Sequence, residues 1–149
     1  MPLKIENYCD RAIQWAVGRL GSTDYPFKCL SFVEDAYELG NGIVLVGYGA
    51  AKAAADGYKA AAHTTAPLKG TFVFYDCWGD IQGEYRNWSH VGLALGDGRV
   101  VHAWRQVRID DYLEVQELSP ADGWTRPKYI GGAPVTEILK GMSVRRPGA

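Results

Sequence analysis

The sequence predicts an α+β fold in which N-terminal helices pack on an antiparallel β-sheet. Apolar residues recur at helical spacing before Gly40, whereas β-branched and aromatic runs dominate after Pro67. Two of those runs are joined by a Gly-Asp-Gly turn, which is typical of antiparallel pairing. Helices followed by strands, rather than alternating with them, indicate the α+β class. A chain of 149 residues suits one hydrophobic core, so we expect a single domain over residues 1–149.

Two N-terminal helices are expected. The first covers Asn7–Leu20, begins at a residue favoured as an N-cap and ends at Gly21. The second covers Cys29–Leu39 and stops at Gly40. Its apolar residues cover most of the circumference, which is typical of a helix at the centre of a domain.

The later elements follow from local composition. Residues 50–62 are alanine-rich enough to be helical, although Gly57 interrupts them. The acidic run RIDDYLEVQE is interpreted as a solvated face in which Asp110 caps a short helix. The remaining expected elements are strands over TFVFYD (71–76), QVRID (106–110) and Lys128–Ile130, and a short helix over Val135–Leu139.

Bulk composition excludes several classes of protein. A net charge of −1 gives no general attraction to nucleic acid or acidic membranes, so neither is expected as a partner. The most apolar stretch, GIVLVGYGAA, is too short and too glycine-rich to span a bilayer. No export signal is visible at the N-terminus, and localisation stays unassigned. We expect a soluble monomer, and the sequence leaves open whether the chain is one domain of a longer protein.

Two histidines, His90 and His102, flank the turn in SHVGLALGDGRVVHAW. A three-residue loop over Gly96–Gly98 pairs His102 with Gly92 and puts both histidines on one face, whereas a two-residue turn sends them to opposite faces. Gly98 supplies the positive φ that closes a three-residue loop without strain. In that register the two imidazoles lie close enough to hydrogen-bond. In the alternative interpretation, His102 is a core residue and His90 a polar strand end.

Three cysteines at wide spacing predict at least one free thiol and no disulfide framework. Cys29 lies at the expected start of the central helix, where unpaired amides favour the thiolate and lower the thiol pKa. His90 would accept its proton and His102 would orient that base, which is the papain-like solution to acyl transfer. Cys9 and Cys77 border apolar elements and are interpreted as small buried hydrophobes.

These segments resemble the NlpC/p60 family of cysteine peptidases of bacterial cell-wall turnover. YPFKCLSFVEDAY matches the family's tyrosine ahead of a helical cysteine, LKGTFVFYD its core strand, and HVGLALGDGRVVHA its histidine hairpin, within about Arg11–Trp104. The resemblance implies a papain-like NlpC/p60 fold with Cys29 as nucleophile, His90 as general base and His102 as the third, orienting residue. It also implies that Tyr25 and the backbone amide of Cys29 lie near the oxyanion.

The sequence departs from the family pattern around the nucleophile. Lys28 precedes Cys29 where the family has aspartate, and Leu30-Ser31 follow where it has Ser-Gly. Gly-Asp before the core strand is replaced by Gly70-Thr71. These changes bear on the identity of the substrate more than on the fold.

Substrate contacts are expected from Tyr25, Trp88 and Ser89. Trp88 shares the segment DCWGDIQGEYRNWSH with Trp78 and Tyr85. This segment is expected to be an aromatic loop, which is either a substrate wall or folded onto its own side chains.

The sequence therefore predicts a cysteine hydrolase that cuts an amide bond in a peptide or peptidoglycan fragment through a Cys-His-His triad and an acyl-enzyme thioester. The prediction includes no cofactor and no metal. Three alternatives stay open: a zinc site built from Cys29, His90, His102 and Cys77, a non-catalytic peptide-binding module, and an acyltransferase using the same triad.

Overall fold

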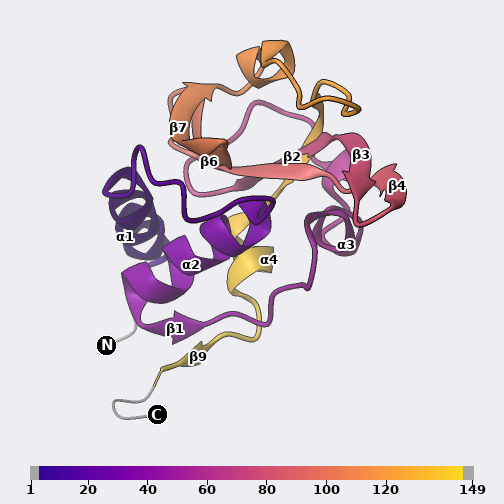
Figure 1. Cartoon of the computed structure of the whole chain (residues 1–149). Helices are drawn as coiled ribbons and strands as arrows, with labels where there is room; N and C mark the ends of the chain where they lie inside the picture. The colour runs from indigo at the N-terminus through magenta and orange to yellow at the C-terminus, as the bar shows by residue number, and fades with distance from the viewer. Residues whose placement is uncertain (1–3, 146–149) are drawn as a thin grey trace.

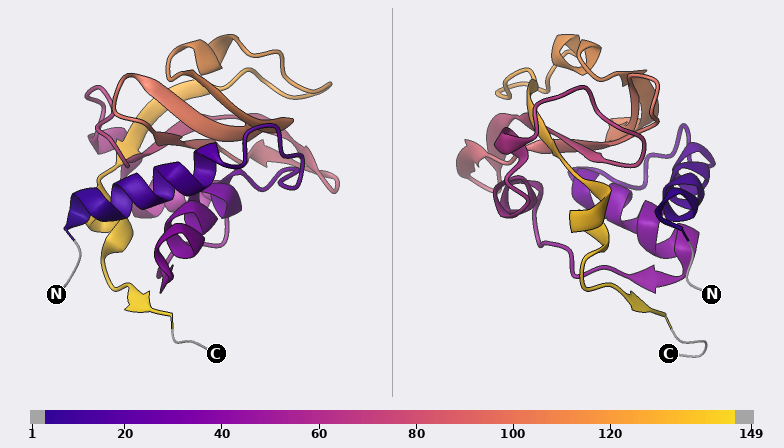
Figure 2. Two further views of the ribbon diagram at one scale, coloured as in Figure 1. Left: turned by 90° about the vertical axis from the view of Figure 1, so that its left-hand side faces the viewer. Right: turned by 180° about the vertical axis from the view of Figure 1, so that it is seen from behind.

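The computed structural model describes residues 4–145, which form a five-stranded antiparallel sheet with the helices gathered on one face (Figure 1). The strand order is β7-β6-β5-β2-β8, so β5 lies between β6 and β2. Views from the side and from behind show the helices below the sheet and the short segment η2 above it (Figure 2). The predicted α+β class, with N-terminal helices on an antiparallel sheet, is confirmed.

The helices α1, α2 and α3 precede the main sheet in sequence, whereas η2 and α4 lie among and after its last strands. The helical elements are α1 (Ile5–Val17), α2 (Cys29–Asn41), α3 (Ala51–Gly57), η1 (Ala60–Ala62), η2 (Glu114–Glu117) and α4 (Val135–Leu139). The main sheet holds β2 (Phe72–Asp76), β5 (His90–Ala94), β6 (Arg99–Trp104), β7 (Gln106–Asp111) and β8 (Lys128–Ala133). Two smaller pairs are β1 (Ile43–Val44) with β9 (Ser143–Val144), and β3 (Trp78–Ile81) with β4 (Glu84–Asn87).

The main core lies between α2 and the sheet. Phe32, Val33 and Tyr37 of α2 are fully buried against the side chains of Phe72 and Phe74 on β2. Each such side chain contributes roughly 1.5–3 kcal/mol when it is removed from water. A second, smaller cluster covers the other face of the sheet beneath η2. This packing fixes the start of α2 against the sheet, which is what positions the site.

The ends of the first two helices differ from the prediction. Helix α1 begins two residues before Asn7, which makes no cap, and its regular part ends before Leu20. Helix α2 continues through Gly40 to Asn41, and Gly42 provides the left-handed terminus. A Cβ on Gly40 would lie 2.7 Å from the carbonyl oxygen of Arg11, so this glycine allows α1 and α2 to approach closely. It was predicted to stop the helix, but its small size serves packing.

The later helical and strand predictions were correct in part. The alanine-rich segment forms α3 and η1, which are separated by Lys59 in a left-handed conformation. Helix α4 has the predicted bounds, and β8 extends three residues beyond the predicted strand. In the turn before η2 the carboxylate of Asp111 accepts the backbone N–H of Leu113 and Glu114. The carboxylate of Asp110 instead accepts from His102 and Arg108, so Asp110 is not the cap that was predicted.

The β5–β6 hairpin has the three-residue loop and the register that place both histidines on one face. Leu93 pairs with Val101, and the N–H of Leu95 donates to the carbonyl of Arg99 at 2.9 Å. The same register puts Gly92 opposite His102, and a Cβ on Gly92 would lie 3.2 Å from the Cβ of His102. The missing side chain therefore leaves room for the imidazole.

The aromatic segment before His90 was expected to be a loop and is instead the β3–β4 hairpin. Its turn uses Gln82 and Gly83, both with positive φ, and the carboxylate of Asp80 accepts the N–H of Gly83 at 2.8 Å. Two consecutive residues with positive φ suit the right-handed twist of a tight hairpin. Within residues 4–145, no helix combines the length and apolar character needed to cross a bilayer.

Candidate active site

Cys29 is the first residue of α2, and its thiol faces the start of β5. Backbone N–H groups of Val91, Leu30 and Cys29 itself lie near the sulfur and favour its ionised form. Lys28 at the N-cap offers no side-chain cap, so the first amides of α2 stay free to face a negatively charged group. The contact with Val91 brings the sulfur beside the residue that follows His90.

Burial dominates the ionisation of the Cys29 thiol. Removal from water raises its pKa above the ordinary value, and the backbone N–H groups only partly oppose this effect. The expectation that the helix start would lower the pKa is therefore wrong for the free protein. At neutral pH the sulfur keeps its proton until a base accepts it.

A continuous chain of hydrogen bonds runs from His90 back into the sheet. Nε2 of His90 lies 2.8 Å from Nδ1 of His102. Nε2 of His102 lies 2.8 Å from a carboxylate oxygen of Asp110. Arg108 donates two hydrogen bonds to the same carboxylate, from Nε at 2.8 Å and from Nη2 at 3.1 Å. The sequence predicted roles for Cys29 and the two histidines, which lie on the elements that meet here, whereas Asp110 and Arg108 were not assigned to this site.

The carboxylate fixes the proton on every ring of this chain. Burial alone would raise the pKa of Asp110, but hydrogen bonds from His102 and Arg108 outweigh it and hold the pKa below the usual range. An ionised carboxylate only accepts, so Nε2 of His102 carries the proton and its Nδ1 accepts. His90 then donates from Nε2, and its Nδ1 keeps a free lone pair. The network thus assigns the tautomer in which Nδ1 of His90 can accept a proton.

Both imidazoles are neutral at rest. Burial lowers the pKa of His90 well below its ordinary value, and His102 adds to this effect. Burial also lowers the pKa of His102, although Asp110 opposes it. His90 and His102 are buried, so a proton that reaches His90 comes from the pocket side.

Cys29 and His90 open into a pocket of about 520 Å³ at the junction of α2, the hairpins and the loop after η2. Tyr25, Trp88 and Ser89, the three predicted substrate contacts, all line it. His102 lies behind His90, outside the lining. The pocket is bordered by further aromatic side chains that the sequence interpretation did not assign, namely Phe27, Tyr48, Trp104 and Trp124.

The polar groups of the three predicted contacts are all used inside the protein. The Tyr25 hydroxyl donates to Asp35 at 2.8 Å, and burial together with Asp35 raises its pKa to about 12. The Ser89 hydroxyl donates to the carbonyl of Tyr75 at 2.8 Å. The indole N–H of Trp88 donates to the carbonyl of Gly79 at 2.9 Å. These residues therefore present ring or backbone surface to the pocket.

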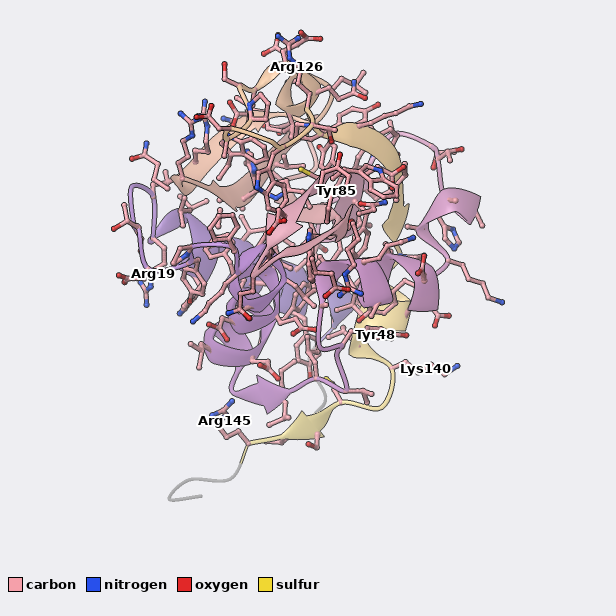
Figure 3. All side chains as sticks on the ribbon, turned by 45° about the vertical axis from the view of Figure 1, so that its right-hand side comes forward. Arg19, Tyr48, Tyr85, Arg126, Lys140 and Arg145 are labelled. Carbon is pink, nitrogen blue, oxygen red and sulfur yellow. The ribbon has the colours of Figure 1, made fainter. Side chains whose placement is uncertain are left out.

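Trp78 and Tyr85 do not line the pocket. Their ring centroids lie 6.1 Å apart on the β3–β4 hairpin, and both side chains are exposed. Figure 3 shows Tyr85 on this hairpin. For these two residues the interpretation of a segment folded onto its own side chains fits the structure, whereas Trp88 belongs to the pocket wall.

The other two cysteines and the residues of the predicted zinc set have surroundings that do not favour a metal ion. Cys9 and Cys77 are buried, and burial together with the nearby Cys29 raises the pKa of Cys77 to about 12. In the described part of the chain, no three His, Cys, Asp or Glu side chains are arranged to hold a metal ion. Both ring nitrogens of His102 already have hydrogen-bond partners, which leaves none for the metal in the proposed zinc set.

Comparisons with known proteins bear on the family and the fold. The model of the NlpC/P60 family matches residues 15–121, a range that contains Cys29, both histidines and Asp110. A solved structure of NlpC1 from Trichomonas vaginalis has a similar fold, with a TM-score of 0.53 and 16% identity. The similarity covers 87% of this chain and 44% of that one, so the chain spans less than half of its length. No curated protein matches.

Proposed function

Because the chain belongs to the NlpC/P60 family, whose members are generally cysteine peptidases and amidases, we propose that it hydrolyses an amide bond of a cell-wall peptide. The observation that carries this proposal is the hydrogen-bond chain from Asp110 through His102 to His90. It leaves a lone pair on Nδ1 of His90, beside the pocket that also holds Cys29. A neutral base next to a neutral thiol is a general-base arrangement.

The reaction proceeds in two halves. The Cys29 sulfur attacks the carbonyl carbon while its proton passes to Nδ1 of His90, and the oxygen of the tetrahedral intermediate faces the amide of Cys29 at the start of α2. The intermediate collapses, the C–N bond breaks, and His90 returns the proton to the leaving amine. Water, deprotonated by His90, then cleaves the thioester and restores the thiol.

Asp110 acts as a positioning residue throughout. When His90 becomes an imidazolium, its Nε2 proton stays directed at His102, whose own proton stays directed at the carboxylate. The negative charge of Asp110 stabilises that cation through the intervening ring, and Arg108 keeps the carboxylate ionised and oriented. Neither residue touches the reacting atoms.

Digestion of purified peptidoglycan tests the proposal. Mass analysis of the released fragments identifies the broken bond, and a covalent acyl adduct on Cys29 identifies the intermediate. Cys29→Ala and His90→Ala should abolish release while the proteins stay folded by circular dichroism. Full activity in Cys29→Ala would overturn the proposal. Offering amines as competing acceptors distinguishes hydrolysis from acyl transfer, because a transferase forms the new amide at the expense of the acid.

A further inference from the structure

The pocket beside Cys29 is cationic. Among the residues that line it, all of which belong to the described part of the chain, Lys28 and Arg105 carry positive charge and none is an aspartate or glutamate. Lys28 directly precedes the nucleophile. Arg105 follows Trp104, whose ring packs edge-on against the imidazole of His90 with 5.2 Å between the ring centroids. Charges at these positions favour a negative group near the reacting pair and disfavour an ammonium group.

Nearby carboxylates do not neutralise this charge from the pocket wall. Asp35 accepts the hydroxyl of Tyr25, and Glu34 accepts the backbone N–H of Tyr48 at 3.1 Å. Both carboxylates thus lie behind residues that line the pocket, and neither is part of the lining. Burial raises the pKa of Glu34 to about 7, which further reduces its negative charge at neutral pH.

The same pocket has an aromatic wall made by two separate segments. The ring of Phe27 stacks on that of Trp124, with 5.7 Å between the ring centroids and an interplanar angle of 30°. The side chain of Phe27 is 74% exposed. Phe27 adopts a left-handed backbone conformation two residues before the nucleophile, which is uncommon for a bulky side chain. Trp124 packs over Gly79, where any Cβ would collide with the indole. The loop ahead of α2 and the loop after η2 therefore meet through an exposed Phe27 stacked on a half-buried Trp124.

Strain and exposure of this kind are retained at sites that bind ligands. A stacked pair of rings, of which Phe27 is exposed and Trp124 half-buried, offers flat apolar surface to a side chain or acyl group. Lys28 and Arg105 supply the complementary polar recognition. Together these features define the chemistry of the group that fits beside Cys29.

We propose that the substrate is an acidic, N-blocked or internal peptide segment, with an apolar group against Phe27 and Trp124 and a carboxylate facing Lys28 and Arg105. This inference rests on the proposed function and specifies its substrate class. A free amino terminus beside the scissile bond is disfavoured, because the lining has two cations and no carboxylate to pair with it.

The test measures the rate at which Cys29 is alkylated by each of four probes. The reactions are run at pH 8, where His90 is neutral. Peptide mass spectrometry distinguishes alkylation of Cys29 from that of Cys9 and Cys77. Iodoacetamide is the neutral reference, iodoacetate the anion, bromoethylamine the cation, and N-phenethyl iodoacetamide the apolar probe. Each rate is divided by the rate of glutathione with the same reagent. Relative to iodoacetamide, iodoacetate and the phenethyl probe should react faster with Cys29, and bromoethylamine more slowly.

Variants assign these preferences to residues. Lys28→Gln and Arg105→Gln should each lower the iodoacetate preference by about threefold, the size of a single-charge effect across a partly hydrated pocket. Lys140→Gln and Arg145→Gln, which remove charges near α4 and β9, are matched controls and should leave it unchanged (Figure 3). Phe27→Ala should remove the preference for the phenethyl probe, whereas Leu68→Ala, another exposed apolar residue, should not.

Two different failures can be distinguished. A Cys29 that reacts with iodoacetamide at the same rate with and without His90 overturns the proposed function. A Cys29 whose reactivity depends on His90 but shows no charge or apolar preference, or one whose preference survives in the Lys28→Gln, Arg105→Gln double variant, overturns the substrate class alone.

Discussion

The carboxylate of Asp110 lies 2.8 Å from Nε2 of His102, on the side of that ring opposite His90. Two neighbouring strands create this contact, because β6 and β7 pair His102 with Arg108 and place Asp110 diagonally across from the histidine. The negative charge is therefore held two rings away from the nucleophile, where it organises protons without competing for the substrate.

Asp110→Asn should lower kcat by about 100-fold or more, with little change in KM, because the variant loses the charge that fixes the tautomer of His102 and stabilises the His90 cation. Steady-state kinetics across pH 5–9 on the peptide fragment that the enzyme cleaves would measure both effects. Asp111→Asn is the matched control, since the Asp111 carboxylate accepts backbone N–H groups in the turn before η2 and is hydrogen-bonded to neither histidine. Equal losses in the two variants would contradict the role assigned to Asp110.

Tyr25→Phe should retain activity within a few-fold and lose about 1 kcal/mol of unfolding free energy. The hydroxyl donates to Asp35, so its removal deletes a structural hydrogen bond and no contact with the substrate. Urea unfolding and kinetics on the same preparation separate the two effects. A kcat reduced 100-fold with unchanged stability would instead identify the hydroxyl as an oxyanion donor.

The alkylation rate of Cys29 should rise with pH through 8 and beyond, with no plateau below neutrality. The reason is that burial raises the pKa of the thiol and lowers that of His90, so the pair is neutral at rest. Iodoacetamide rates from pH 5 to 10, read at Cys29 by mass spectrometry, measure this profile. A fast reaction that is already constant at pH 6 would mean that the pair exists as thiolate and imidazolium before substrate binds.

Gly40→Ala should destabilise the protein by about 1–3 kcal/mol, although alanine is the better helix former. The added methyl group would meet the carbonyl oxygen of Arg11 at 2.7 Å and force α1 away from α2. Gly49→Ala, where an added Cβ meets nothing within 4 Å, is the comparison for stability measured by urea unfolding. Increased stability of Gly40→Ala would show that helix propensity outweighs the helix contact.

Glu34 should make the protein less stable as pH rises from about 4.5 to about 7. Burial raises its pKa from 4.5 to about 7, so the folded state favours the protonated form; its contribution is complete below pH 4.5 and is lost as pH rises through 7. The difference in unfolding free energy between wild type and Glu34→Gln isolates this effect. The difference should change across that window. A difference that stays constant from pH 4 to pH 8 would contradict the assigned role of Glu34.

The sequence was informative where local chemistry decides structure. Glycines in the Gly96–Gly98 turn fix the β5–β6 register, and the bounds of α4 were predicted, because both depend on residues close in sequence. The start of α2 at Cys29 was also predicted. Gly40 was misinterpreted because only the approach of α1, a tertiary contact, explains a glycine within α2.

Asp110 was missed for a related reason. Strand β7 was expected, but its register against β6 depends on a one-residue connection at Arg105, which has a φ of 64°. A bulky residue in the left-handed region is not favoured by sequence preferences. With that turn known, counting from His102 would have placed Arg108 and Asp110 on its face of the sheet.

The proton relay and its arginine partner all come from three successive strands, between residues 90 and 110, whereas the sulfur comes from the helical part of the chain. The candidate site is thus assembled from two parts of the chain that are far apart in sequence and are held together by the core between α2 and the sheet. Neither part alone contains both the sulfur and the imidazoles, so the site exists only when the helix is packed on the sheet. Loss of that packing should therefore remove the proposed activity before the strands themselves unfold.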